Sequence, residues 1–274
     1  MKELVQNGVV DDDQQPIVHP YISKNRLKGR IEKWLKRIYW STYYLLHTNT
    51  SSDGVEYIYK RRDYDRLVIV FTSMVGRFNF IRSLKDAPYD QLFIRDCWAG
   101  NASYYWFEGK QDYPELFTQN LIDQVLAKGI YKEVITLGGS KGGTSAIYYG
   151  LKNNFDLVFA GACQYMVGDY LAKHQYVSKP WQWEKVVGGE PTKEWIDILN
   201  QKLEKMIDSH KNSKTIIKLV YSTEEHTYPE HLAFLIKKLD ECNIQHDDHI
   251  ESFTKHSMSG LYLKQDIEKY FTAK

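Results

Sequence analysis

Ser140 lies in the segment Gly138-Gly139-Ser140-Lys141-Gly142, which has the G-x-S-x-G pattern of a serine nucleophile. An apolar run precedes this segment and a helical pattern follows it. A strand that turns sharply into a helix can hold a serine in a strained conformation only if the residues two before and two after are almost without side chains. Gly138 and Gly142 meet this need. We therefore predict a nucleophile elbow at Ser140, in preference to a glycine-rich turn that only allows close packing.

These glycines do not have the spacing of a nucleotide-binding loop. A P-loop requires the order Gly-Lys-Ser/Thr, whereas Lys141 follows Ser140 and precedes Gly142. The dinucleotide pattern G-x-G-x-x-G also fails, because the positions two after Gly138 and Gly139 are occupied by Ser140 and Lys141. Nucleotide binding by this segment is therefore excluded.

A serine nucleophile needs a general base and a carboxylate, which in this strand–elbow–helix setting follow it in the order acid, then histidine. The apolar segment TIIKLVYS is followed by TEEH, which places two carboxylates on the next loop. Counting a small-x-x-acid turn from Ser222 favours Glu225 as the acid, with Glu224 as the second candidate. His256, in the segment FTKHSMSG, follows the last predicted strand and is the predicted base.

The anionic intermediate of acyl transfer needs two backbone N–H donors. The first should be the N–H of Lys141, at the positive end of the helix that follows the elbow; we expect no role for its side chain. The second should come from Ser73 or Met74, in the segment FTSMVGRFNF after another apolar run. Arg77, in the same segment, is a candidate for binding an anionic group of the substrate, and a solvated charge is the alternative.

Strand and helix patterns alternate along the chain, which predicts an α/β fold with a mostly parallel, doubly wound sheet. The predicted strands are Val55–Lys60, Leu67–Thr72, Leu92–Asp96, Val134–Gly138, Leu157–Gly161, Thr215–Ser222 and His249–Phe253. The predicted helices are Pro114–Lys128, Lys141–Lys152, Pro229–Cys242 and Ser259–Lys269.

Two regions stand outside this alternation. Residues 1–54 form a predicted N-terminal extension with a basic amphipathic helix, RLKGRIEKWLKRIYWSTYYLL. We favour docking of this helix on the body over binding to an anionic membrane surface or a partner. Residues 55–274 form the predicted main domain, in which residues 164–213 interrupt the strand series and are predicted to form a cap over the site.

Composition narrows the class of protein. The 36 basic and 35 acidic residues nearly cancel, which excludes the strongly basic character of a dedicated nucleic-acid binder. Three widely spaced cysteines support neither a disulfide framework nor a zinc motif, so we predict no metal and no cofactor. The first residues, MKELVQNGVVDDDQQ, lack the apolar segment of a signal peptide, and a cytoplasmic location is expected.

Four segments, FTSM, LFIRD, GGSKGGTSAIYYGLK and KHSMSG, resemble the XcbB/CpsF-type capsular polysaccharide biosynthesis proteins. They are also similar to accessory Sec system proteins that O-acetylate sugars. The resemblance implies an α/β-hydrolase fold with Ser140 as nucleophile, His256 as base, and Glu225 or Glu224 as acid. The sequence departs from the commonest pattern in having Glu where Asp is usual and in lacking an HGGG-type oxyanion motif.

The resemblance further implies an acylated cell-surface or capsular carbohydrate as the substrate, with an esterase or O-acyltransferase activity. Aromatic residues in the predicted loops suit sugar rings, and among them we single out Trp98 and Tyr165 as candidate substrate contacts. The alternative is a non-catalytic scaffold in a glycan-assembly or secretion complex, peripheral at the membrane. It predicts that His256 and Ser140 lie far beyond hydrogen-bond reach.

Overall fold

The structure, a computed structural model, describes residues 26–74, 76–177 and 179–272. The chain divides into two compact units, residues 1–49 and 50–274. The described part of the first unit contains the helix α1 (Arg26–His47), so the predicted basic helix is present. None of the described helices combines the length and the apolar character needed to cross a bilayer. Whether α1 docks on the body or binds a membrane or partner stays a prediction.

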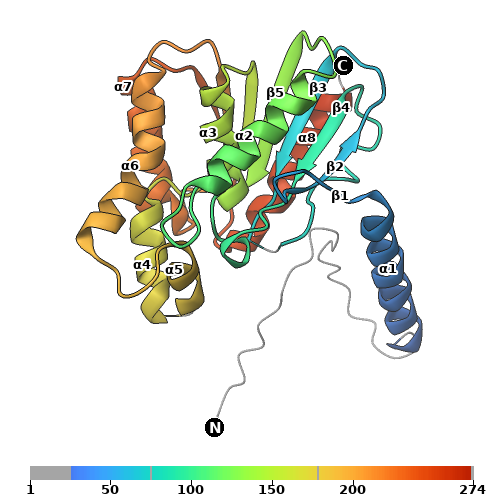
Figure 1. The fold of residues 1–274 in the computed structure, drawn as a ribbon, viewed down its shortest axis with the longest axis horizontal. Helices are drawn as coiled ribbons and strands as arrows, with labels where there is room; N and C mark the ends of the chain where they lie inside the picture. Colours follow the sequence, from blue (N-terminus) through green and yellow to red (C-terminus); the bar gives the residue numbers. More distant parts are fainter. Residues whose placement is uncertain (1–25, 75, 178, 273–274) are drawn as a thin grey trace. The chain divides into compact units, whose positions relative to one another are not determined.

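The second unit is built on an eight-stranded sheet with the strand order β1-β2-β4-β3-β5-β6-β7-β8 (Figure 1). From β4 to β8 the neighbouring strands are parallel. The pairing of β2 with β4 is antiparallel. The sheet is therefore mixed in detail but mostly parallel, as predicted. The strands are β1 (Asn49–Thr50), β2 (Glu56–Lys60), β3 (Arg66–Phe71), β4 (Asp90–Ile94), β5 (Glu133–Gly139), β6 (Leu157–Gly161), β7 (Ile216–Tyr221) and β8 (His246–Ile250).

The last strand begins three residues earlier than predicted. The prediction of His249–Phe253 was wrong because β8 lies at the edge of the sheet, where the segment HDDHI is half-buried at its first residue and exposed at the other four. An edge strand with solvent beside it needs no apolar pattern. Its register is set instead by pairing with β7, in which Ile217 lies opposite His246 and Tyr221 opposite Ile250.

Helices cover both faces of the sheet. On β6, Val158 and Gly161 point to opposite faces because side chains alternate along a strand. Val158 packs closely against Gly150 of the helix after the elbow, whereas Gly161 faces Leu263 near the C-terminus. The helices are α2 (Tyr113–Leu126), α3 (Lys141–Lys152), α4 (Val167–Val177), α5 (Pro180–Val186), α6 (Lys193–Ser209), α7 (Ala233–Glu241) and α8 (Ser259–Thr272). Three short helices, η1 (Ala99–Asn101), η2 (Tyr228–Leu232) and η3 (His256–Met258), complete the fold.

Between β6 and β7, where a cap was predicted, the chain forms α4, α5 and α6. These helices pack on one another, and α6 also packs on α3. In Figure 1, α4 and α5 lie beyond one end of the strands, while α6 runs back beside them. The strands themselves form the centre of the core: every residue of β4 and β6 is buried.

Candidate active site

Ser140 lies at the sharp turn between β5 and α3, with a backbone φ of 53° and ψ of −125°. Few residues other than glycine adopt a positive φ, so the turn is strained at this position. Glycines relieve the crowding around it. A Cβ on Gly138 would overlap the backbone carbonyl of Gly142, and a Cβ on Gly142 would overlap the carbonyl oxygen of Phe71. The predicted elbow geometry is therefore present in the structure.

Two nitrogen atoms lie within hydrogen-bond distance of the Ser140 hydroxyl. The Nε2 atom of His256 is 2.9 Å from Ser140 Oγ. On the other side, the side-chain amide of Gln164 donates from Nε2 to the same oxygen at 3.0 Å. Because an amide nitrogen only donates, the hydroxyl proton has the imidazole as its acceptor when His256 Nε2 carries no proton.

Glu225 lies behind the imidazole, with its Oε1 3.3 Å from His256 Nδ1 and its side chain fully buried. The other carboxylate oxygen, Oε2, accepts hydrogen bonds from the backbone N–H and the hydroxyl of Thr227. Burial by itself raises the pKa of Glu225, but the bonds from His256 and Thr227 and the nearby imidazoles outweigh it, and the pKa lies below its ordinary value. Glu225 is thus an ionised carboxylate whose Oε1 lies at ion-pair distance from His256 Nδ1.

The residues on either side of Glu225 in the sequence, Glu224 and His226, make different contacts. Glu224 points away from His256 and accepts a hydrogen bond from the hydroxyl of Ser252 at 3.0 Å. His226 brings a second imidazole to the same carboxylate oxygen, with its Nδ1 2.5 Å from Glu225 Oε1. Of the two candidate acids, only Glu225 is within contact distance of His256 in the described structure.

These side chains meet because parallel strands end at one edge of the sheet. Ser140 follows β5, Gln164 follows β6, Glu225 follows β7 and His256 follows β8. In an open α/β sheet, ligands bind outside the carboxyl ends of the strands. Ser140 and His256 are therefore neighbours in space although they are 116 positions apart in the chain.

The two predicted sources of the second oxyanion donor are not equivalent. The backbone N–H of Ser73 donates to Asn79 Oδ1 at 3.1 Å, so it is already engaged. Within the described residues, no acceptor is found for the backbone N–H of Met74 or for that of Lys141, the first residue of α3. Met74 and Lys141 therefore each offer a free backbone N–H donor.

Comparison with solved structures identifies the fold. The sequence matches no protein-family profile, and it has no match among the curated proteins. The capsule O-acetyltransferase of Neisseria meningitidis serogroup A superposes with a TM-score of 0.66 at 19% identity, over 82% of this chain and 92% of that one. The fluorophosphonate-binding serine hydrolase F of Staphylococcus aureus gives a TM-score of 0.61 at 12% identity, over 82% and 95% of the two chains. A glycosylation-associated protein complex (Gap123) of Streptococcus agalactiae gives 0.65 at 16% identity, over 83% of this chain and 45% of that one.

The chain has the α/β-hydrolase fold. In this fold the nucleophile elbow joins a central strand to the helix behind it, as β5 joins α3 here. The mostly parallel α/β sheet was predicted from the alternation of strand and helix patterns, and the α/β-hydrolase fold from the resemblance; the structural comparisons confirm both.

From the sequence we expected no role for the side chain of Lys141, but the structure shows it in a buried ion pair. Its Nζ lies 2.6 Å from Asp96 Oδ2, and both side chains are fully buried. The ammonium also lies 4.7 Å from the ring centre of Tyr105. Burial lowers the pKa of Lys141 from its ordinary value of 10.5, and the charge and hydrogen bond of Asp96 partly offset this effect. The expectation was wrong because the helix turns this side chain inward, where it requires a charged partner.

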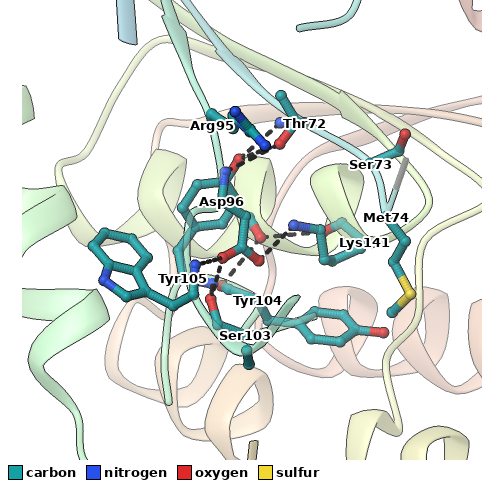
Figure 2. A network of polar contacts seen from close by, with 12 residues as sticks. Thr72, Ser73, Met74, Arg95, Asp96, Ser103, Tyr104, Tyr105 and Lys141 are labelled. Carbon is teal, nitrogen blue, oxygen red and sulfur yellow. Dashed lines mark hydrogen bonds and ion pairs between the residues drawn. The ribbon is translucent and has the colours of Figure 1, made fainter. Parts of the chain in front are cut away.

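Asp96 connects the elbow to the loop that carries Met74 (Figure 2). Its Oδ1 accepts bonds from the hydroxyl of Ser103 at 2.6 Å and from the backbone N–H of Trp98 at 3.2 Å. Its own backbone N–H donates to Thr72 Oγ1 at 3.2 Å. Asp96 thus contacts Lys141 through its buried carboxylate and Thr72, two residues before Met74, through its backbone N–H.

The three predicted substrate contacts have different surroundings. Trp98 is 8% exposed and Tyr165 is 5% exposed, so both pack mainly in the core. Arg77 is exposed in the loop after β3. Closer to the oxyanion donors, Gln182 of α5 donates from Nε2 to the sulfur of Met74 at 3.0 Å. The region between β6 and β7 therefore reaches the loop beside the nucleophile.

Sequence reasoning did not assign the contacts that four side chains make at the site: Asp96, Gln164, Gln182 and His226. Asp96 ends the predicted strand segment LFIRD, and a charged residue at the carboxyl end of a buried strand is a usable signal. Gln164 also follows a buried strand, and His226 is adjacent to the predicted acid. Gln182 lies on a separate helix and has no comparable signal.

Proposed function

We propose that this protein is a serine-dependent acyl-transfer enzyme, an O-acyltransferase or esterase, that acts on an acylated cell-surface or capsular carbohydrate. The observation that carries the proposal is the chain of contacts from Ser140 Oγ to His256 Nε2 at 2.9 Å and from His256 Nδ1 to Glu225 Oε1 at 3.3 Å. A nucleophile, a base and an orienting carboxylate in this geometry are the elements of covalent acyl transfer.

In the first half of the proposed reaction, Ser140 Oγ attacks the carbonyl carbon of the acyl donor while its proton moves to His256 Nε2. Glu225 holds Nδ1–H and stabilises the imidazolium that forms. The backbone N–H groups of Lys141 and Met74 donate to the oxyanion. When the intermediate collapses, the bond to the leaving group breaks and His256 returns the proton to that group, leaving an acyl ester on Ser140.

In the second half, His256 removes a proton from the acceptor hydroxyl, and the acceptor oxygen attacks the acyl ester. The bond between the acyl carbon and Ser140 Oγ then breaks, and His256 returns the proton to Ser140. A sugar hydroxyl as the acceptor makes the protein a transferase, and water makes it an esterase. The choice of carbohydrate is supported by the likeness to a capsule O-acetyltransferase. A variant of that acetyltransferase was solved in complex with CoA, which makes acetyl-CoA the first acyl donor to try. We further propose a cytoplasmic location and work beside other proteins of glycan assembly, since a glycosylation-associated complex has a similar fold.

The proposal is tested by intact-mass analysis after treatment with a fluorophosphonate, which labels activated serines. We expect one adduct on the wild type and none on Ser140→Ala or His256→Ala. Ser145→Ala is the matched control, because Ser145 lies on the same helix and bonds to backbone oxygens within the fold. It should be labelled like the wild type. A folded wild-type protein without any adduct, or a Ser140→Ala protein with the same adduct, contradicts the proposal.

The non-catalytic scaffold required Ser140 and His256 to lie far beyond hydrogen-bond reach, and the distance between them is 2.9 Å. Transferase and esterase are separated by incubating the protein with acetyl-CoA, with and without a sugar acceptor. A transferase releases CoA fast only when the acceptor is present and forms an acetylated sugar. An esterase releases CoA or acetate at the same rate in both cases.

A further inference from the structure

His226 gives Glu225 Oε1 a second imidazole neighbour, for which the proposed reaction has no use. Its Nδ1 lies 2.5 Å from that oxygen, closer than the 3.3 Å of His256 Nδ1. The two imidazole rings lie 5.6 Å apart, centre to centre. The side chain of His226 is 51% exposed and that of His256 is 33% exposed. The three residues therefore form a cluster with a buried carboxylate and two imidazoles that solvent can reach.

The two oxygens of Glu225 have separate surroundings. Thr227 supplies both the backbone N–H and the hydroxyl that bond to Oε2. This holds the carboxylate in place and leaves Oε1 to the two imidazoles. Metal-binding carboxylates are commonly held in this way by a hydrogen bond to the oxygen that does not bind the metal.

We propose that Glu225, His226 and His256 form a binding site for zinc-like divalent cations, and that occupation of this site inhibits the enzyme. The inhibition rests on the proposed function, whereas the binding does not. One donor atom from each of the three residues lies within 4.8 Å of the others. In a tetrahedral zinc centre with bonds of about 2.0–2.1 Å, donor atoms are separated by about 3.3 Å.

Two of the three donor separations can be compared directly with that geometry. The separation of 3.3 Å between His256 Nδ1 and Glu225 Oε1 already fits, and that of 2.5 Å between His226 Nδ1 and Glu225 Oε1 must widen. His226 can make this movement because half of its side chain is exposed. Two imidazole nitrogens and one carboxylate oxygen favour zinc, copper, nickel or cobalt over magnesium and calcium, which prefer oxygen donors.

A metal at His256 Nδ1 changes which nitrogen carries the proton. In the proposed active form, Nδ1–H donates to Glu225 and the lone pair of Nε2 accepts the proton of Ser140. A metal ion takes the lone pair of Nδ1, so that the proton of the neutral ring moves to Nε2. Nε2–H then donates to Ser140 Oγ and cannot accept its proton. The bound cation therefore removes the general base without moving His256 away from Ser140.

Binding is tested by titrating the EDTA-treated and dialysed full chain with ZnCl2 in a calorimeter. Titration with CoCl2 adds a readout, because tetrahedral cobalt absorbs strongly in the visible range. We expect one site on the wild type and on Ser140→Ala, no binding of MgCl2, and a cobalt spectrum typical of four ligands. His226→Asn should weaken zinc binding by more than about tenfold, since loss of an outer-shell partner alone costs about 10–100-fold.

His249→Asn is the matched control. This histidine also contacts two carboxylates, Glu251 at 2.8 Å and Asp266 at 2.6 Å, and is 45% exposed. The cluster around His249 thus contains one imidazole and two carboxylates, whereas the proposed site contains two imidazoles and one carboxylate. We expect His249→Asn to bind zinc like the wild type. Equal zinc affinity of wild type and His226→Asn, or loss of affinity in His249→Asn, overturns the proposal in favour of a surface site.

Inhibition is measured as the rate of fluorophosphonate labelling with and without zinc. Zinc should slow labelling of the wild type, and EDTA should restore it. The rate of His226→Asn without zinc serves as that variant's own reference, and zinc at concentrations that inhibit the wild type should leave this rate unchanged. Zinc that binds at the His226 site without slowing the labelling overturns the inhibition. If the wild type is never labelled, the proposed function has failed, while the calorimetric and cobalt titrations still decide the metal site.

Discussion

The buried pair of Lys141 and Asp96 makes a quantitative prediction about stability. Asp96→Asn removes the negative charge that faces the Lys141 ammonium but keeps a side-chain oxygen for the bonds from Ser103 and from the Trp98 N–H. Both members of the pair are fully buried. Removing one partner of a buried pair costs about 3–5 kcal/mol, because the other charge stays in a medium that solvates it poorly. For a domain of this size, that loss lowers Tm by roughly 6–20 °C.

The assay is urea unfolding of the wild type, Asp96→Asn, Lys141→Met and the double variant. Replacing both charges leaves no unpaired ion, so the double variant should regain most of the stability that either single variant loses. A cost below about 1 kcal/mol for each single variant would match an exposed ion pair and refute the reasoning. A double variant no more stable than the less stable single variant would refute it as well.

The pH dependence of Asp96→Asn provides a second check on the same pair. Burial already lowers the pKa of Lys141 below 10.5, and without Asp96 the opposing effect is lost. The unfolded chain then binds a proton that the folded variant releases, so the free energy of unfolding should rise with pH up to about 10.5. A variant whose deficit relative to the wild type is constant from pH 7 to pH 10 would show that the lysine charge is not the cause.

Three further outcomes follow from the site and its surroundings. Glu225→Gln should slow fluorophosphonate labelling by roughly 10²- to 10⁴-fold, whereas Glu224→Gln should leave its rate unchanged; equal effects would contradict the assignment of the acid. His231 is 2% exposed, and burial lowers its pKa from 6.5 to about 4. Urea titrations should therefore show that the free energy of unfolding decreases by about 3 kcal/mol as pH falls from 6.5 to 4, because the unfolded chain takes up a proton that the folded chain does not. His231→Gln should lose much less stability over the same pH range. Gly138→Ala should destabilise the fold by at least about 2 kcal/mol. Gly139→Ala should cost much less, because a Cβ at position 139 meets only Leu263 at 3.5 Å. Similar urea midpoints for the two variants would refute the crowding argument.

The fold and the three proposed catalytic residues could be predicted because their signals are local. Ser140 lies in a short motif between a strand and a helix, Glu225 follows an apolar run, and His256 follows the last predicted strand. Parallel strands bring their carboxyl ends to one edge, so position relative to a strand is enough to group these residues.

The contacts that the sequence did not reveal depend on which strands are neighbours and on where side chains point. Asp96 and Lys141 are 45 positions apart, and Gln164 and Ser140 are 24 apart. Each pair meets only because β4, β3, β5 and β6 lie next to one another in that order. The burial of Trp98 and Tyr165 has the same origin, since an aromatic residue in a loop has no local signal that separates a ligand contact from a core position.

The three helices between β6 and β7 also affect how such an enzyme could change its substrate over evolution. They leave the sheet and return to it between two adjacent parallel strands, so their length and sequence do not alter the strand order. One of them places Gln182 against Met74, beside the proposed oxyanion donors. A gene that exchanged only this segment would keep Ser140 and His256 while replacing the side chains beside Met74. If the proposed function holds, selection for a new acceptor can therefore act on one contiguous stretch of the chain.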